Sequence, residues 1–178
     1  DPEPTPQGLY LWGGVGRGKT FLIDLFFAGL PIQEKRRTHF HRFMRDVHQR
    51  LREHAGERDP LVAIAREWRR SLRVLVLDEF FVSDIGDAML LGRLLERLFA
   101  EGVVLVTSSN AAPPELYKDG LQRALRQVAV SDLAARGATQ HADFTRRERR
   151  EVVVQHERLG GLALVLERIQ ALHVVRGA

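Results

Sequence analysis

The residues best suited to chemistry lie near the start of the chain, at 13–20. This stretch, Gly-Gly-Val-Gly-Arg-Gly-Lys-Thr, fits the pattern G-x-x-x-x-G-K-[ST]. Small residues let a backbone wrap closely around a polyphosphate, whose charge is met by backbone N–H groups and the positive end of the next helix. Lys19 is expected to reach the β- and γ-phosphates, and the Thr20 hydroxyl to bind Mg²⁺. The context predicts a nucleotide site rather than an empty glycine-rich turn, with contacts from Gly13, Gly14, Val15, Gly16, Arg17, Gly18, Lys19, Thr20 and Phe21.

A pair of acids, Asp78 and Glu79, is the second candidate. It follows the apolar, β-favouring run 74–77 directly. Ligands of an open parallel sheet bind outside the carboxyl ends of its strands, so the pair is expected beside the glycine-rich loop. Asp78 can then hold hydrated Mg²⁺ opposite Thr20, while Glu79 polarises a water for attack on the γ-phosphate. A general-base Glu suits hydrolysis better than transfer to a second substrate. Without the loop, the same pattern would indicate only a strand that ends in a solvated turn.

Asn110 is a third candidate, because it ends the next predicted strand. Its side-chain amide can orient the attacking water, but Asn before Ala-Ala-Pro-Pro is equally consistent with a simple turn. An arginine that reaches the γ-phosphate from a neighbouring subunit often completes such a site. Arg123 and Arg126 follow the Asn110 strand closely and are the candidates for this role.

Two histidines, His39 and His41, form a His-x-His pattern in a stretch that alternates like a strand. Strand geometry would place both side chains on one face of the sheet. A metal site needs at least one more ligand, and none is visible at a suitable spacing. We therefore expect a packed or partner-facing pair rather than a metal site.

The elements that position these residues follow from hydrophobic periodicity. Strands are expected at 9–12, 38–43, 74–77 and 103–106, the last running into 107–110. Helices are expected at 21–27, 44–54, 61–68, 84–101 and 121–136, and a short one is expected to open at 113–114. Further on, 151–155 is consistent with a strand and 162–173 with a helix. Strands that alternate with helices through short loops predict an α/β fold with a mainly parallel sheet flanked by helices.

Composition sets broad limits on function. The 178 residues suffice for about one domain with a single well-filled core. The absence of cysteine excludes disulfides, thiolate catalysis and cysteine-based metal sites. A net charge of +4 permits contact with nucleic acid, anionic lipid or an acidic protein and selects none of them. No apolar run approaches the length needed to cross a bilayer.

Longer strings of sequence resemble the AFG1-like ATPases, a branch of the AAA+ superfamily. The matches are 8–20, 39–44, 78–85, 109–110 and 114–123. His-Phe-His-Arg-Phe-Met at 39–44 and Asp-Glu-Phe-Phe-Val-Ser-Asp-Ile at 78–85 are far more specific than the phosphate loop. After Arg123 the chain departs from the usual family pattern, so sensor-2 and lid residues stay unassigned.

The resemblance implies a P-loop NTPase core of the AAA+ type at 8–136, after a linker at 1–7. Residues 137–178 would be the C-terminal part of that core or an incomplete lid. It implies that ATP and Mg²⁺ are the cofactors, bound through Lys19 and Thr20. Asp78 would coordinate the metal, Glu79 would activate water and Asn110 would be the sensor-1 residue. Of the two arginines, it favours Arg123 as the finger, which implies a homo-oligomer.

The resemblance further implies ATP hydrolysis coupled to action on a protein partner. Bacterial members are linked to cell division at the FtsZ ring, in the cytoplasm at the inner face of the membrane, which allows a peripheral membrane association. Mitochondrial relatives are linked to protein quality control. One alternative is a nucleic-acid-associated ATPase of the helicase-loader type, although no platform of aromatic and basic residues supports a nucleic-acid partner. Another is a nucleotide-dependent scaffold whose hydrolysis is incidental.

Overall fold

The computed structural model describes residues 8–13, 19–30, 32–112 and 120–132. Within them, five strands form one parallel sheet in the order β2-β3-β4-β1-β5. The strands are β1 (Gly8–Trp12), β2 (Lys35–His39), β3 (Val74–Asp78), β4 (Val104–Ser109) and β5 (Val128–Asp132). The helices are α1 (Lys19–Gly29), α2 (Phe40–Glu53), α3 (Pro60–Arg69), α4 (Ile85–Ala100) and α5 (Gly120–Leu125). This arrangement confirms the predicted α/β fold with a parallel sheet.

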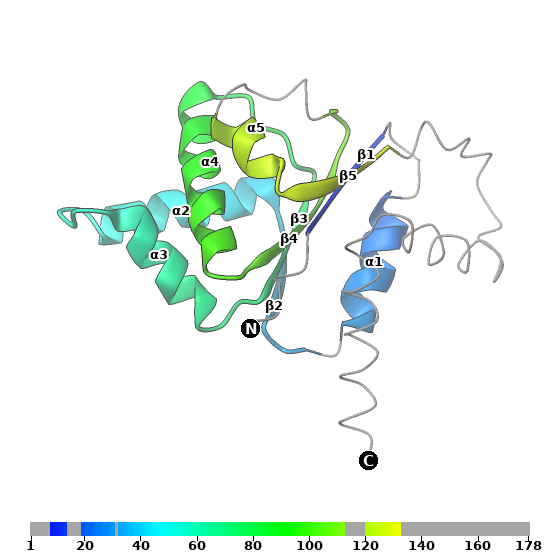
Figure 1. Cartoon of the computed structure of the whole chain (residues 1–178), viewed down its shortest axis with the longest axis horizontal. Coiled ribbons are helices and arrows are strands. Elements are labelled where there is room, and N and C mark those ends of the chain that lie inside the picture. Colours follow the sequence, from blue (N-terminus) through cyan, green and yellow to red (C-terminus); the bar gives the residue numbers. More distant parts are fainter. Residues whose placement is uncertain (1–7, 14–18, 31, 113–119, 133–178) are drawn as a thin grey trace, which may run out of the picture.

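The helices lie on both faces of the sheet: α1 is on one side, and α2, α3, α4 and α5 are on the other (Figure 1). Successive side chains of β3 point alternately into two separate hydrophobic cores, one on each face of the sheet. Val74 and Val76 pack on the α1 side with Ile23 and Leu30, while Leu75 belongs to the larger core beneath α2 to α5. Strands buried on both faces explain why β3 and β4 appear in the sequence as continuous apolar runs.

Two helices begin at clear capping signals. Asp59 precedes Pro60 at the first position of α3, and its side chain accepts a hydrogen bond from Val62 N. Asp84 caps α4 by accepting from Asp87 N at 2.8 Å. Such caps satisfy backbone donors that the first helical turn leaves unpaired. They confirm the predicted start of α4 near Asp84.

The predicted second strand was wrong in its bounds. The strand β2 ends at His39, and α2 begins at Phe40. Alternation over a few residues fits either element, but buried Phe40, Phe43 and Val47 recur at helical spacing and pack on one side of α2. As a result His39 ends a strand while His41 lies exposed on the first turn of a helix, so the two do not share a strand face.

The predicted helix at 121–136 was also wrong beyond its first turns. The helix α5 ends at Leu125, and β5 then pairs in parallel with β1, with Val128 opposite Gly8. Pairing with a strand far away in sequence decides this segment, because Val-Ala-Val is compatible with helix and strand alike. The elements predicted at 113–114, 151–155 and 162–173, the linker at 1–7 and the region 137–178 lie outside the described residues.

Two large apolar side chains of α4 are exposed. Ile85 and Met89 lie at helical spacing with the buried residues of this helix, yet they are 63% and 61% exposed. The buried side of the helix is formed instead by Ala88, Leu91 and Leu95.

Among the described residues, no helix has the length and apolarity needed to span a bilayer.

Candidate nucleotide-binding site

The predicted site residues meet at one edge of the sheet. All five strands are parallel, so their carboxyl ends lie together. Gly13 follows β1, Asp78 ends β3 with Glu79 next to it, and Asn110 follows β4. Gly13 N donates a hydrogen bond to Ser109 O at 3.2 Å, which joins the start of the phosphate loop to the end of β4. The fold therefore brings the first, second and third candidates to the same edge.

The phosphate half of the site consists of the end of β1 and the start of α1. Lys19 is the first residue of α1, and its Nζ donates to Gly13 O at 2.5 Å. Thr20 is exposed in the first helical turn, and Phe21 follows it within α1. The remaining predicted contacts lie outside the described residues, namely Gly14, Val15, Gly16, Arg17 and Gly18. The Lys19 side chain thus reaches back to the residue that follows β1.

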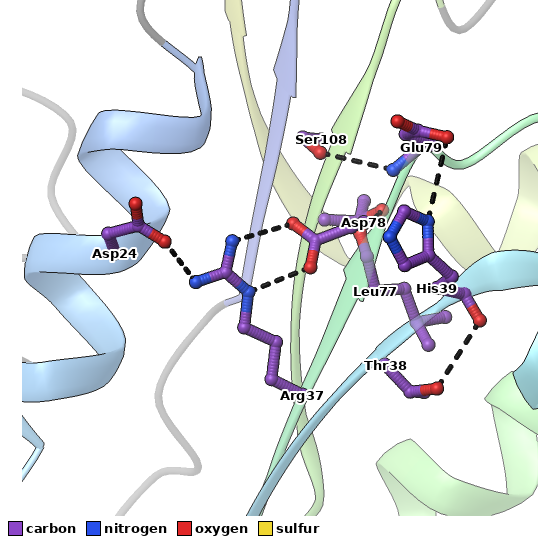
Figure 2. Close-up of polar contacts among 9 residues, drawn as sticks. Asp24, Arg37, Thr38, His39, Leu77, Asp78, Glu79 and Ser108 are labelled. Atoms are coloured by element: carbon purple, nitrogen blue, oxygen red, sulfur yellow. Dashed lines mark hydrogen bonds and ion pairs between the residues drawn. The ribbon is translucent and has the colours of Figure 1, made fainter.

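The carboxylate of Asp78 is bound on both oxygens by Arg37 of β2 (Figure 2). Arg37 Nε donates to Asp78 Oδ2 at 2.7 Å, and Nη2 donates to Oδ1 at 3.1 Å. The remaining terminal nitrogen of Arg37 donates to Asp24 on α1. The hydrogen bond to Asp78 is the main reason that the pKa of the Arg37 guanidinium is raised above its ordinary value. Arg37 is therefore a permanent cation between two carboxylates.

Glu79 has a strained backbone, with φ of 55° in the left-handed region. For a non-glycine residue this conformation costs about 1–2 kcal/mol and is held by its surroundings. Its N–H donates to Ser108 Oγ at 3.3 Å, and Phe80 N donates to Ser108 O at 2.7 Å. The Glu79 side chain is 74% exposed, with Oε2 3.5 Å from His39 Nδ1. The turn points an accessible carboxylate away from the core at the end of β3.

A buried hydroxyl network supports this turn from β4. Ser109 Oγ donates to Phe80 O at 2.6 Å and accepts from Ala111 N at 3.1 Å. Tyr10 Oη donates to Ala111 O at 2.7 Å, so β1 reaches the same loop. Asn110 lies between Ser109 and Ala111 and is exposed. The predicted water-orienting residue is thus held on both sides by fixed neighbours.

The two candidate finger arginines lie away from these strand ends. Arg123 is on α5, and its Nε donates to Glu96 Oε1 of α4 at 2.7 Å. Arg126 follows α5 and is exposed. A role for either at the phosphates of its own chain is not indicated by these positions, whereas a role toward another copy stays a prediction.

The donors at this edge fit magnesium. Mg²⁺ prefers oxygen ligands, keeps several waters and uses one or two protein groups together with substrate phosphates. The Thr20 hydroxyl and the Asp78 carboxylate supply such a set. In the described part of the chain, no three His, Cys, Asp or Glu side chains gather into a metal site of their own. A metal held jointly by protein and nucleotide suits this arrangement better than an all-protein cage.

Sequence patterns missed Arg37, Ser108 and Ser109. Arg37 lies one residue before the predicted start of the second strand. The sequence pattern therefore did not place it in a strand or predict which face of the sheet its side chain would take. The serines were visible only as the polar end of a strand. A basic residue in a strand beside two acids of other elements is a signal, but its partners become known only once the strand order is known.

The chain is similar to a known protein family along most of its length. The AFG1-like ATPase family profile matches residues 2–144. Cell division protein ZapE of Escherichia coli (strain K12) is 58% identical over 144 residues, which are 80% of this chain and 37% of that protein. The chain thus spans well under half of the length of this relative.

Two solved structures share the fold. Domain III of the Thermotoga maritima replication initiation protein DnaA aligns with a TM-score of 0.57 at 21% identity, over 73% of this chain and 56% of that one. AMPPCP-bound DnaA from Aquifex aeolicus aligns with a TM-score of 0.53 at 16% identity, over 72% and 40%. These likenesses show a shared fold, a parallel sheet flanked by helices. The family profile and the sequence match to ZapE show that the chain belongs to the AFG1-like ATPase family.

Proposed function

We propose that this chain binds ATP with Mg²⁺ and hydrolyses it to ADP and phosphate. The observation that carries the proposal is the Asp78-Glu79 pair at the end of β3, at the same edge of the sheet as the start of the phosphate loop and with an exposed Glu79 carboxylate. The family name, AFG1-like ATPase, supports ATP as the ligand.

Each residue has a defined task in the proposed reaction. Lys19 exchanges its contact with Gly13 O for the β- and γ-phosphates. Thr20 and Asp78 would hold Mg²⁺, which supplies charge neutralisation at the phosphates. Glu79 accepts a proton from the attacking water, and Asn110 orients that water. Because Glu79 points outward from a rigid turn, its carboxylate can meet a water without a rearrangement of β3.

The substitution Glu79→Gln tests the reaction class. It keeps the shape of the side chain and removes its basicity, so we expect hydrolysis to fall about 10²- to 10⁴-fold while ATP binding is retained. Glu53→Gln, the same change at an exposed position of α2, is the matched control and should hydrolyse ATP at the wild-type rate. Undiminished turnover of the Glu79 variant would rule out the proposed general base.

We further propose a protein as the target of this ATPase. The relative from Escherichia coli carries the name cell division protein, which supports a target in cell division. We propose the FtsZ ring, at the inner face of the cytoplasmic membrane, as that target. The DnaA likeness shows the fold alone and adds nothing to the helicase-loader alternative. Stimulation of ATP hydrolysis by FtsZ polymers, compared with stimulation by single-stranded DNA, separates the two. Stimulation by DNA alone would favour the alternative.

The proposed oligomer would use Arg123 at the site of a neighbouring copy. Arg123 is 66% exposed even with its Glu96 contact, so it lies at the surface where another chain could meet it. We expect the ATPase rate per chain to rise with protein concentration, and this rise to be lost in Arg123→Ala. Arg126→Ala is the parallel variant: if it alone abolishes the rise, the finger is Arg126.

A further inference from the structure

The strand β2 sends its two α1-facing basic side chains to the helix that follows the phosphate loop. Lys35 Nζ donates to Phe27 O at 2.6 Å and to Leu30 O at 3.0 Å, at the end of α1. Arg37 reaches Asp24 nearer the start of the same helix. The intervening Arg36 goes to the opposite face, where it pairs with Asp46 and lies over Trp68. Only one of the two neighbouring arginines therefore lies on the side of the site.

Asp24 lies one helical turn beyond Thr20. Residues four apart share one face of a helix, so the Asp24 carboxylate and the Thr20 hydroxyl lie along the same side of α1. Arg37 binds Asp24 with one nitrogen and Asp78 with two others (Figure 2). Through this one guanidinium, the helix that carries Thr20 is connected to the carboxylate that ends β3.

We propose that Arg37 is a positioning residue that sets the Mg²⁺ affinity of the nucleotide site, by holding the Asp78 carboxylate in place relative to Thr20. This inference rests on the proposed function. The inference concerns Arg37, which hydrogen-bonds a proposed metal ligand, rather than the metal ligands Thr20 and Asp78 themselves. Residues that hydrogen-bond a metal-ligating carboxylate from outside change metal affinity by about 10- to 100-fold when removed.

The two-point contact allows Arg37 to stay in place when the metal binds. A carboxylate offers about four lone-pair positions, and a guanidinium fork takes one on each oxygen. The remaining lone pairs can face the metal or one of its waters. The pair is also well shielded, with 22% of the Arg37 side chain and 15% of the Asp78 side chain exposed, so its geometry is little disturbed by solvent.

The test is the Mg²⁺ concentration that gives half-maximal binding of a fluorescent, non-hydrolysable ATP analogue to the full chain. We expect Arg37→Ala to raise this concentration about 10- to 100-fold. Arg37→Lys should give an intermediate rise, because lysine keeps the charge but loses the planar fork. Arg36→Ala is the matched control, the same change at the adjacent residue on the other face of β2, and should leave the Mg²⁺ requirement unchanged.

The outcomes separate this inference from the proposed function. An unchanged or lower Mg²⁺ requirement in Arg37→Ala overturns the positioning role, and a lower one would mean that Arg37 competes with the metal. Wild-type protein without Mg²⁺-dependent binding overturns the proposed function itself. Should Arg37→Ala fail to fold, Asp24→Asn replaces it, since Asp24 is 57% exposed and its removal frees one end of the bridge. A smaller rise supports the inference, and no rise contradicts it.

Discussion

The phosphate half and the acidic half of the site are built differently. In the acidic half, the Glu79 N–H donates to Ser108 of β4, Ser109 of β4 donates to Phe80 O, and Arg37 binds the Asp78 carboxylate. In the phosphate half, the described contacts are Gly13 N to Ser109 O and Lys19 Nζ to Gly13 O. In the acidic half, side chains of neighbouring strands therefore hold the acids, whereas Lys19 contacts the residue that follows β1 in its own segment of the chain.

The two halves are expected to respond differently to the proposed nucleotide. Lys19 would exchange the Gly13 carbonyl for a phosphate. Asp78 can keep Arg37, because its oxygens retain unused lone pairs. We therefore expect Lys19 to change its partner on nucleotide binding while Arg37 keeps its contact with Asp78. The following substitutions test that contrast.

Within this comparison, the largest effect on nucleotide affinity is expected from Lys19→Ala, which removes the proposed ligand-binding charge of the phosphate half. Losing charge-assisted hydrogen bonds worth about 1.5–3 kcal/mol should raise the nucleotide Kd roughly 10- to 160-fold. Equilibrium binding of a fluorescent ATP analogue measures this. Lys35→Ala, whose lysine binds carbonyls at the other end of α1, is the control and should alter stability more than affinity. Equal Kd values for wild type and Lys19→Ala would contradict the assignment.

Ser109→Ala disturbs the acidic half without touching a charge. Phe80 O and Ala111 N would lose their hydrogen-bond partner, the Ser109 hydroxyl, and Ser109 is almost completely buried. We expect the free energy of unfolding to fall by about 1–3 kcal/mol, because buried polar groups would be left unsatisfied. Urea denaturation measures the loss, with Ser71→Ala on the surface as control. A loss no larger than that of the control would show that the network is dispensable.

The strain at Glu79 predicts an inverted order of two variants. At φ of 55°, glycine is tolerated better than alanine, so Glu79→Gly should be more stable than Glu79→Ala by about 1 kcal/mol. At exposed Arg45, within α2, the order should reverse by about the same amount, because alanine favours a helix. Thermal unfolding of the four variants checks both orders. The same order at both positions would mean that Glu79 is unstrained.

The smallest effect is expected far from the site, where α2 meets α3. His54 lies between Glu57 and Glu67, and these carboxylates raise its pKa above 6.5, Glu57 contributing most. A raised folded-state pKa adds stability that is fully present below about pH 6.5 and is lost as pH rises through the folded pKa. Relative to His54→Gln, wild-type protein should therefore melt higher at low pH and lose that advantage as pH rises.

This pH effect also serves as a control for the site. The nucleotide Kd of His54→Gln should match that of wild type at each pH, since the histidine bridges helices rather than strand ends. A melting advantage that grew with pH would contradict the direction of the His54 shift.

Local patterns were enough to predict much of the fold and most of the candidate site. The run 74–77 ending in Asp78 and Glu79 identified β3 and its acids, because a doubly buried strand requires continuous apolar residues. The glycines and Lys19-Thr20 identified the junction of β1 and α1 for the same kind of local reason. Because parallel strands end at one edge of a sheet, these patterns also predict that Gly13, Asp78 and Asn110 lie at the same edge.

Tertiary contacts decided what local patterns leave open. Residues 38–43 alternate like a strand, yet most of them form a helix, because Phe40 packs against Phe80 and Phe43 against Trp68 in the core. Pairing with β1 likewise makes 128–132 the strand β5. Arg37 is the clearest case, since its two carboxylates lie 13 and 41 residues away along the chain. Residue types and their spacing were enough to identify the groups that could bind a nucleotide and its metal. Only the folded structure decided what holds them, because that depends on contacts between segments far apart in the chain.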